Sequence, residues 1–412
     1  MNKIKLLLLS LLFFSFSAFA QSLNLSDAAK ISILTCSPSE EVYAKFGHSG
    51  VRVCDVATHT DIVFNYGIFS FNTPNFIGKF IAGATDYRLG IERTTDFLLD
   101  YSLRNSQVTE QVLNLNESEK RKFIALLEEN CKPENIEYRY NFVYDNCATR
   151  PRNLVMASVD GYVELINPTY EWLTFRELVA QYVGKNTWTM FGIDMIFGAE
   201  SDQIASEMNA MFLPEILRNE FRESRIVNLN TDTTKPLVAA QHVLVAPTNA
   251  VDEVSKVSFP FLVFFLLLLL RLFLLYRETK DDHRKYRWFD TPFLVLTGLV
   301  GCIAFYLTFI SEHPMVGENY NLLWLMPLNI VAGILLWFRS MRKLLFGYFA
   351  LTEAFLLIAA SIYALNVQAV NYTFMPIMLT LFIIGTSWIR RGNRLFRKAK
   401  HKKAKLLKRY AK

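Results

Sequence analysis

The chain has 412 residues, of which 52% are hydrophobic, 14% aromatic and 20% charged. This composition excludes an intrinsically disordered protein and favours membrane-spanning segments, and the length allows two or three domains. The net charge of +6 is unevenly distributed, because residues 390–412 contain twelve Lys or Arg and no acid. The rest of the chain has 32 basic and 38 acidic residues and a net charge of −6. The five cysteines lack metal-ligand spacing, which argues against a zinc site.

The first 20 residues have the three parts of a secretory signal peptide. Lys3 and Lys5 form the charged start, Leu6–Phe16 the apolar region and Ala18–Ala20 the small-x-small end. The sequence therefore predicts a signal peptide at 1–20 and a mature chain that begins near Gln21, outside the cytoplasm. A retained membrane anchor is the alternative.

Residues 21–250 are typical of a soluble α+β domain. Asn116–Glu119 has the pattern of a capping box and precedes a helical run that Pro133 ends. Gly50–Val53 and Asp61–Tyr66 are short and β-rich, which predicts a hairpin. Further predicted elements are strands at Val108–Leu115 and Glu137–Phe142, a helix at Pro151–Ala157 and a loop at Asn228–Pro236.

After Lys256 the chain becomes strongly apolar, and five segments are long enough to span a membrane. They are Val257–Tyr276, Pro292–Ile310, Leu322–Phe338, Leu345–Leu365 and Tyr372–Ile389. The sequence therefore predicts a five-helix transmembrane bundle over 257–389.

The connections between these segments predict the orientation. Arg277–Arg287 and Arg339–Lys343 are basic, whereas Ser311–Asn321 and Asn366–Asn371 contain no Lys or Arg. Basic connections face the cytoplasm, so the N-terminal domain is expected outside and the tail, 390–412, inside. The tail is then a topology anchor attracted to anionic lipid. Nucleic-acid binding by the tail is the alternative.

Two ionisable residues, Arg271 and Glu353, fall within the predicted spans. An ionisable group at that depth is costly unless it is paired or reaches the interface. We therefore expect Arg271 and Glu353 to pair, and snorkelling of Arg271 is the alternative.

The N-terminal domain has two polar segments that could carry chemistry, Phe46–Gly50 and Tyr144–Arg150. Asp145 or Asn146 can cap the helix that follows, which places Cys147 at a helix N-terminus. Free N–H groups and the helix dipole there favour thiolate over thiol, and a nearby imidazole would complete an activated nucleophile.

Other roles for these residues remain open. Cys147 could pair with Cys36, Cys54 or Cys131 in a disulfide, or be a buried apolar residue. His48 is the expected base, with His59 as a competitor in the hairpin connection. Asn65 could orient the His48 imidazole or merely end its strand.

The order of a histidine followed by an Asn-Cys pair at a helix start resembles the permuted papain-like thiol fold of lecithin:retinol acyltransferases and NlpC-type hydrolases. More closely, the chain resembles the Lnb family of bacterial lipoprotein N-acyltransferases. The residues that carry this resemblance are Phe46–Ser49, Asn65–Gly67, Gln111–Leu115, Tyr140–Phe142, Tyr144–Arg150 and Asn321–Trp324.

The resemblance implies a permuted papain-like periplasmic domain and a five-helix domain in the bacterial inner membrane. It implies that Cys147 takes a fatty acyl chain from a membrane phospholipid or lipoprotein. His48 would accept the thiol proton and later help to deprotonate the amine, and Asn65 would be the third catalytic residue. The acceptor would be the α-amino group of a diacylated lipoprotein, and no cofactor, metal or nucleic acid is expected.

Contacts with substrate are expected from residues of both domains. They are Ser49, Tyr66, Asp145, Arg150, His313 and Asn321. The aromatic residues Phe69, Phe71, Phe76 and Phe80 could line an acyl groove, dip into the bilayer or pack in the core. The alternative functions are a membrane-anchored cysteine hydrolase, acting on cell wall or lipid, and a non-enzymatic sensor.

Overall fold

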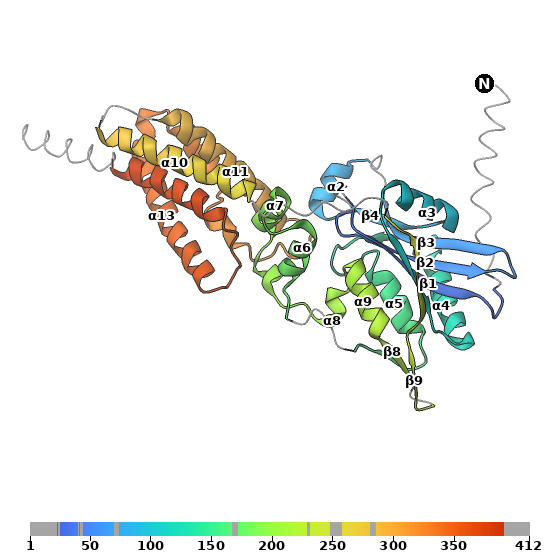
Figure 1. Ribbon diagram of the computed structural model, residues 1–412. Coiled ribbons are helices and arrows are strands. Elements are labelled where there is room, and N and C mark those ends of the chain that lie inside the picture. Colours follow the sequence, from blue (N-terminus) through green and yellow to red (C-terminus); the bar gives the residue numbers. More distant parts are fainter. Residues whose placement is uncertain are drawn as a thin grey trace, which may run out of the picture. The chain divides into compact units, whose positions relative to one another are not determined.

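A computed structural model describes residues 23, 25–39, 41, 44–69, 74–166, 172–228, 231–247, 258–280 and 286–390 (Figure 1). The predicted signal peptide, Phe71 and nearly all of the basic tail lie outside these residues. The chain divides into two compact units. The first draws on Met1–Phe76, Thr85–Glu171 and Ser206–Ala250, and the second on Ile77–Ala84, Trp172–Ala205 and Val251–Lys412.

The first unit is built on an antiparallel sheet that has seven strands in the described residues, in the order β10-β5-β1-β2-β3-β4-β6. The strands are β1 (Lys30–Cys36), β2 (His48–Asp55), β3 (Thr60–Ile68), β4 (Asp86–Arg93), β5 (Val108–Leu113), β6 (Glu137–Arg139) and β10 (Val238–Val245). The predicted hairpin is confirmed, because β2 pairs with β3. The strand predicted at Val108–Leu115 is also present, and that at Glu137–Phe142 is shortened to β6.

Helices cover both faces of this sheet. They are α3 (Thr94–Leu103), α4 (Glu117–Asn130), α5 (Thr149–Ser158), α8 (Glu207–Ala210) and α9 (Pro214–Glu223). Phe97 of α3 packs on Cys36 and Val63, which share one face, while Gln111 on the other face bonds to the Arg218 carbonyl of α9 at 2.8 Å. The predicted capping box at α4 is confirmed, with Asn116 and Glu119 bonded reciprocally.

The segment Asn228–Pro236, predicted as a loop, instead contributes to a second sheet. This sheet has the order β7-β8-β9, formed by β7 (Tyr162–Glu164), β8 (Arg225–Asn228) and β9 (Thr233–Pro236). β8 and β9 form a hairpin in which Asn228 lies opposite Thr233. The threonines favour extended backbone, and the polar residues around them are tolerated because β9 is at the sheet edge. The prediction of a loop is therefore wrong for the ends of this segment.

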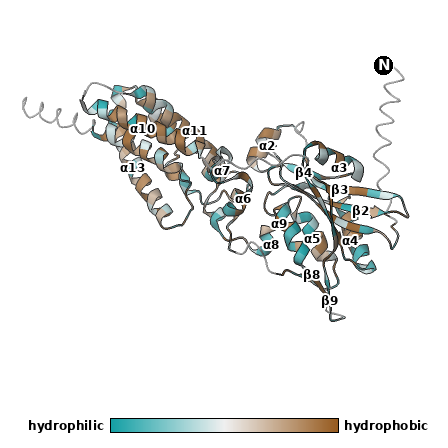
Figure 2. Ribbon diagram, viewed as in Figure 1, coloured by the Kyte–Doolittle hydropathy of each residue, from teal (hydrophilic) through white to brown (hydrophobic). Residues whose placement is uncertain are grey.

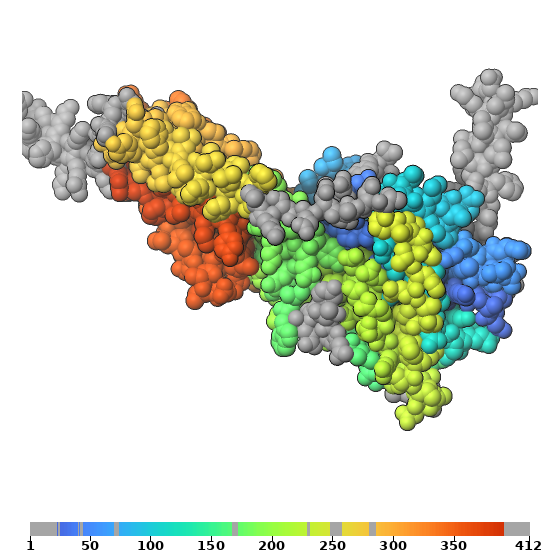
Figure 3. Space-filling view, viewed as in Figure 1, coloured from blue at the N-terminus to red at the C-terminus, as the bar shows by residue number. Residues whose placement is uncertain are grey.

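The second unit contains the apolar helices. Among the described residues, three are long and apolar enough to cross a membrane: Phe259–Thr279, Arg287–Phe309 and Arg339–Ala364. They correspond to α10 (Phe259–Lys280), α11 (Arg287–Phe309) and, after the turn η4 (Arg339–Met341), α13 (Arg342–Ala364). Figure 2 shows them as mostly hydrophobic, and Figure 3 shows α10 lying along the C-terminal helices without a gap on the face in view.

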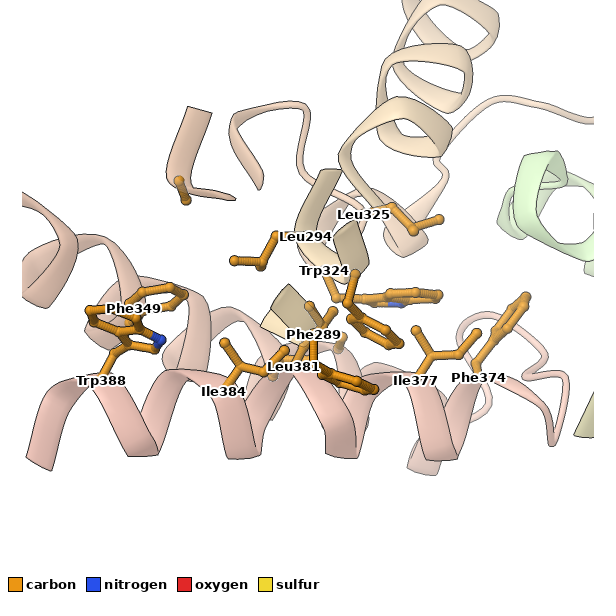
Figure 4. Close-up of a cluster of buried hydrophobic side chains, with 14 of the residues drawn as sticks. Phe289, Leu294, Trp324, Leu325, Phe349, Phe374, Ile377, Leu381, Ile384 and Trp388 are labelled. Carbon is orange, nitrogen blue, oxygen red and sulfur yellow. The ribbon is translucent and has the colours of Figure 1, made fainter. Parts of the chain in front are cut away.

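Two shorter apolar helical segments belong to the same unit, Tyr320–Leu335 and Phe374–Arg390. Residues spaced by three and four along the last helix, from Phe374 to Trp388, all point toward the buried cluster around Trp324 and Phe349 (Figure 4). This spacing is the stripe that a packed helix presents to its neighbours.

The segment Leu322–Phe338, predicted as a continuous span, is interrupted. It comprises the end of η3 (Tyr320–Leu323) and the eight-residue α12 (Leu328–Leu335), separated by four residues that end in Pro327. Eight helical residues extend only about 12 Å, less than half of a hydrocarbon core of about 30 Å. Proline lacks the N–H that would continue a preceding helix, which explains the break. The five-helix count therefore stays a prediction.

Two segments that the sequence places in the N-terminal domain belong to the second unit. One is Ile77–Ala84, which includes most of α2 (Phe76–Ala82). The other is Trp172–Ala205, with α6 (Phe175–Val183), α7 (Trp188–Ile196) and η2 (Ala199–Asp202). Within the unit, Asp194 binds Arg176 at 2.6 Å and Asn371 at 2.7 Å. Such buried polar contacts, distant in sequence, group Trp172–Ala205 with the apolar helices in one compact unit, while the domain boundaries expected from the sequence stay a prediction.

The predicted pairing of Arg271 with Glu353 is wrong. The Arg271 guanidinium is fully buried and lies 2.9 Å from the Asp290 carboxylate and 3.7 Å from that of Glu278. Glu353 instead accepts a hydrogen bond from the Thr386 hydroxyl at 2.7 Å. Asp290 lies before the predicted start of its span at Pro292, whereas α11 begins five residues before that start, at Arg287.

Candidate active site

His48 is the first residue of β2, and the backbone before it explains the glycine in the Phe46–Ser49 motif. Gly47 has a φ of +75°, and a Cβ there would lie 2.6 Å from the Cys36 carbonyl oxygen. Only glycine fits this turn without displacing β1. The turn sets the first side chain of β2 on the sheet face that also carries Cys36 and Asn65, since Cys36 lies opposite His48 and Asn65 follows on β3.

Cys147 lies two residues before α5, near the helix N-terminus at which the sequence predicted it. The Asn146 side-chain oxygen accepts hydrogen bonds from the N–H groups of Ala148 and Thr149, both at 2.9 Å, and so orders the turn that leads into α5. The Asn146 amide group also donates to the carbonyls of Phe142 and Phe212 at 2.7 Å and 2.9 Å. Because this turn is anchored on both sides, Cys147, a residue only 8% exposed, is held in place.

His48, Asn65 and Glu92 form a chain of hydrogen bonds. His48 Nε2 and Asn65 Oδ1 are 2.7 Å apart, and Asn65 Nδ2 donates to Glu92 Oε1 at 2.8 Å. The three residues come from β2, β3 and β4 and share one face of the sheet. The link between Asn65 and His48 is one of the two roles that the sequence left open for Asn65, and Glu92 extends the chain.

The carboxylate at the end of the chain decides the state of the imidazole. An ionised carboxylate can only accept, so the Asn65 amide must present its NH₂ group to Glu92 and its oxygen to His48. His48 must then carry a proton on Nε2, which leaves Nδ1 for Cys147, with which His48 is hydrogen-bonded. Glu92 thus fixes the tautomer through Asn65.

The ionisation of Cys147 and His48 is mutually favourable. Burial raises the pKa of the Cys147 thiol, but the His48 imidazolium, its hydrogen bond to sulfur and the Ser49 backbone N–H together lower that pKa below its usual value. Burial lowers the pKa of His48, and the Cys147 thiolate, the hydrogen bonds to Cys147 and Asn65 and the charge of Glu92 raise it above its usual value. The arrangement favours a thiolate–imidazolium pair, the reactive form of a cysteine nucleophile.

Two family models match the chain. The Lnb N-terminal periplasmic domain matches residues 15–181, and the Lnb transmembrane domain matches residues 252–393. The two matches together cover about three quarters of the chain. The chain belongs to the Lnb family. No curated protein and no solved structure matched the chain.

Membership in the Lnb family indicates a membrane-associated enzyme that processes lipoproteins. The matched domains indicate a periplasmic N-terminal part and a transmembrane C-terminal part.

All five cysteines of this Lnb protein are unpaired. Cys147 is therefore a free thiol next to His48, and the competing base, His59, is exposed in the β2–β3 turn.

Cys36 is a second buried thiol on the His48 side of the sheet, and its environment is the opposite of that of Cys147. It lies opposite His48 in the β1–β2 register. Burial raises the pKa of Cys36 well above its usual value, and a hydrogen bond with Tyr101 only partly opposes that effect. Cys36 therefore stays a thiol, and Cys147 is the one cysteine of the two that is activated.

Gly67 brings β3 close to the nucleophile. Its φ is +90°, and a Cβ there would lie 3.7 Å from the Cys147 Cβ. The pairing of β3 with β4 is irregular between Asn65 and Ile68, as expected for a bulge. Because Asn65 starts this irregular stretch, the bulge contributes to the direction in which its side chain points.

The residues predicted to contact substrate in the periplasmic domain are largely engaged with the protein. Ser49 is buried, and its backbone N–H faces the Cys147 sulfur. Tyr66 is buried, and its hydroxyl accepts from Asn130 at 2.9 Å. Asp145 and Arg150 bind each other at 2.6 Å, and the Arg150 guanidinium lies 3.5 Å from the ring centroid of Tyr138. These contacts support the walls of the site.

His313 and Asn321, predicted at the same site, both belong to the second unit. His313 Nε2 donates to the Phe80 carbonyl at 2.7 Å. Asn321 is fully buried, donates to the Asp194 carbonyl at 2.9 Å and accepts from the Tyr363 hydroxyl at 2.6 Å. The Asn321 side chain thus holds the η3 turn to α7.

Sequence reasoning missed Glu92. It is 27 residues from Asn65, and its role depends on β3–β4 pairing that places it diagonally across from Asn65. The sequence does show a carboxylate shortly after the predicted hairpin. Assigning it to the site requires the register in which its strand pairs with β3, and the sequence does not give that register.

Proposed function

We propose that this Lnb protein is a lipoprotein N-acyltransferase that forms a thioester on Cys147. The observation that carries the proposal is the hydrogen-bonded chain Glu92–Asn65–His48, with the His48 imidazole on the Cys147 thiol. It supplies a thiolate and a proton carrier side by side, as a two-step acyl transfer requires.

In the first step the Cys147 thiolate attacks the carbonyl carbon of an ester in a membrane lipid. In this mechanism the backbone N–H groups of Ser49 and Cys147, which favour negative charge on the sulfur, also stabilise the oxyanion. The intermediate collapses to the acyl thioester and the lipid alcohol, which takes the proton from the His48 imidazolium. The neutral imidazole that remains is the base for the second step.

In the second step the free α-amino group of a diacylated lipoprotein attacks the thioester carbonyl. His48 accepts the proton from the amine, the C–S bond breaks, and the amide product leaves the Cys147 thiolate and the imidazolium as at the start. Both substrates are held in the membrane, so a periplasmic site joined to a transmembrane domain raises their effective concentration. No cofactor takes part in either step.

The proposal is tested by mass spectrometry of lipoprotein N-termini from cells that carry the parent protein, Cys147→Ser or Cys131→Ser. Cys131 is the matched control, because burial raises the pKa of its thiol to about 11 and it has no role in the proposed steps. We expect N-acylated termini with the parent and the control and free amines with Cys147→Ser.

Two outcomes would contradict the proposal. Full N-acylation with Cys147→Ser at normal abundance would exclude the thioester. Unmodified N-termini in all strains, together with fatty acid release that depends on Cys147, would identify a hydrolase, in which water replaces the amine.

A further inference from the structure

The short helix α2 exposes an apolar face. None of its seven residues, FIGKFIA, is buried. Ile77, Phe80 and Ile81 are 74%, 51% and 43% exposed, and Figure 2 shows the helix as hydrophobic. Their spacing of three and four puts them on one side of the helix, and the exposed Lys79 adds a cation. A contiguous apolar face of this kind marks a contact surface rather than a solvated one.

Hydrogen bonds fix α2 to the end of a membrane span. The Glu312 N–H donates to the Ala82 carbonyl at 2.8 Å, and His313 Nε2 donates to the Phe80 carbonyl at 2.7 Å. Glu312 is only three residues beyond the end of α11 at Phe309. α2 therefore lies at the depth at which this span leaves the hydrocarbon core.

The end of α11 has a lipid-facing surface of its own. Phe305, Phe309 and Ile310 are 45%, 66% and 60% exposed. Residues 15–181 match the Lnb periplasmic domain, and α2 lies within them, so this end of α11 faces the periplasm. The apolar residues of α2 thus continue the lipid-facing surface of a transmembrane helix on the periplasmic side.

We propose that α2 is an interfacial helix that inserts Ile77, Phe80 and Ile81 into the outer leaflet of the bilayer. The partner is phospholipid at the boundary between headgroups and acyl chains, where an amphipathic helix buries its apolar side. Lys79 reaches the phosphate layer by extending its long side chain. Of the alternatives raised by the sequence for Phe80, which included core packing, its exposure favours contact with lipid.

The position of α2 in the chain relates this surface to the active site. α2 lies in the connection between β3 and β4, the strands that carry Asn65 and Glu92. Lipid that contacts α2 is therefore in contact with the segment that joins two elements of the site. This part of the inference rests on the proposed function, because it concerns delivery of a lipid donor to Cys147.

Photocrosslinking tests the lipid contact without reference to activity. Benzoylphenylalanine replaces Phe80 in the full-length protein, reconstituted into vesicles of phosphatidylethanolamine with a minority of phosphatidylglycerol and separately irradiated in intact cells. Phe309 is the positive control position, and Val56, 83% exposed in the β2–β3 turn, is the negative one. We expect phospholipid adducts at positions 80 and 309 and none at 56.

Two crosslinking results would overturn the proposal. One is lipid adducts at position 309 with none at position 80. The other is a protein adduct at position 80 in cells, which would show that a polypeptide covers this face.

A second experiment measures the functional consequence. Phe80→Asp places a charge on the apolar face, and Val56→Asp is the matched control at an exposed apolar residue. We expect Phe80→Asp to reduce acyl transfer from a phospholipid donor by about tenfold or more, because the segment that joins the strands of Asn65 and Glu92 then loses its contact with lipid. The rate of Cys147 alkylation should stay at the parent value, which shows an intact site.

The outcomes separate the two proposals. Equal turnover in Phe80→Asp and the parent would overturn the inference about α2 and leave the thioester mechanism standing. Absence of acyl transfer in the parent itself would refute the proposed function, and the crosslinks would still decide whether α2 contacts lipid.

Discussion

Replacing Glu92 with Gln tests whether the carboxylate acts on the active site through Asn65. The substitution keeps the size of the side chain but removes its charge and lets it donate as well as accept. Asn65 can then present either end of its amide to His48, and the tautomer is no longer fixed. The charge that raises the pKa of His48 is also lost.

The size of the electrostatic effect follows from the geometry. Hydrogen bonds of 2.7 Å and 2.8 Å on the two ends of one amide separate the imidazole from the carboxylate. At a separation of about 7 Å two unit charges interact by roughly 1–2 kcal/mol at an effective dielectric of about 20–40. Because Glu92 is partly exposed to solvent, we take the lower end of this range.

The assay is the pH profile of kcat/KM for acyl transfer. Loss of the negative charge destabilises the imidazolium, so the pKa of His48 falls and the alkaline limb moves to lower pH. About 1 kcal/mol corresponds to a movement of about 0.7 pH unit, and the loss of orientation reduces the maximum by about tenfold. Asp96→Asn is the matched control, because that carboxylate is exposed and paired with Arg93 at 2.8 Å.

The reasoning would be refuted by an alkaline limb in Glu92→Gln at the same pH as in the parent. A double-mutant cycle gives a second test. In an Asn65→Ala background the link between Glu92 and His48 is already broken, so Glu92→Gln should add little further loss of rate. Full additivity of the two losses would show that Glu92 acts by another route.

Three other predictions follow from the fold. Gly67→Ala should destabilise the periplasmic domain by more than about 1 kcal/mol in thermal unfolding, because φ is +90° there, and should reduce turnover. Turnover equal to that of the parent would show that the bulge does not position the site. Arg271→Met should destabilise the detergent-solubilised protein by about 3–5 kcal/mol, because Asp290 keeps its charge without the arginine. Adding Asp290→Asn should recover part of the lost stability, and no recovery would argue against the Arg271–Asp290 ion pair. A cysteine at Glu312, on a background without the five native cysteines, should react with an impermeant reagent in intact cells, whereas one in the tail should not. Labelling of the tail would overturn the predicted orientation.

Local patterns in the sequence were sufficient for the parts of the fold that depend on neighbouring residues. Asn116 and Glu119 satisfy each other's backbone groups within one helical turn, so their spacing alone predicted the start of α4. The turn that carries Cys147 into α5 is equally local, since the Asn146 side chain accepts from the N–H groups of Ala148 and Thr149. The β2–β3 hairpin joins strands that are adjacent in the chain. The position of Cys147 near a helix start and that of His48 at the start of a strand were therefore predictable.

Tertiary structure decided the features that depend on residues far apart in the chain. Glu92 joins the site because β4 pairs with β3 in one register, and a shift of one residue would turn its side chain to the opposite face. Arg271 pairs with Asp290 rather than Glu353 because of how α10 packs on α11, which hydropathy does not encode. α2 and the segment Trp172–Ala205 belong to the second unit through buried or backbone polar contacts such as Asp194–Asn371 and Ala82–Glu312. Composition placed both segments in the periplasmic domain, and only the partners of their polar groups assign them to the unit that contains the transmembrane helices.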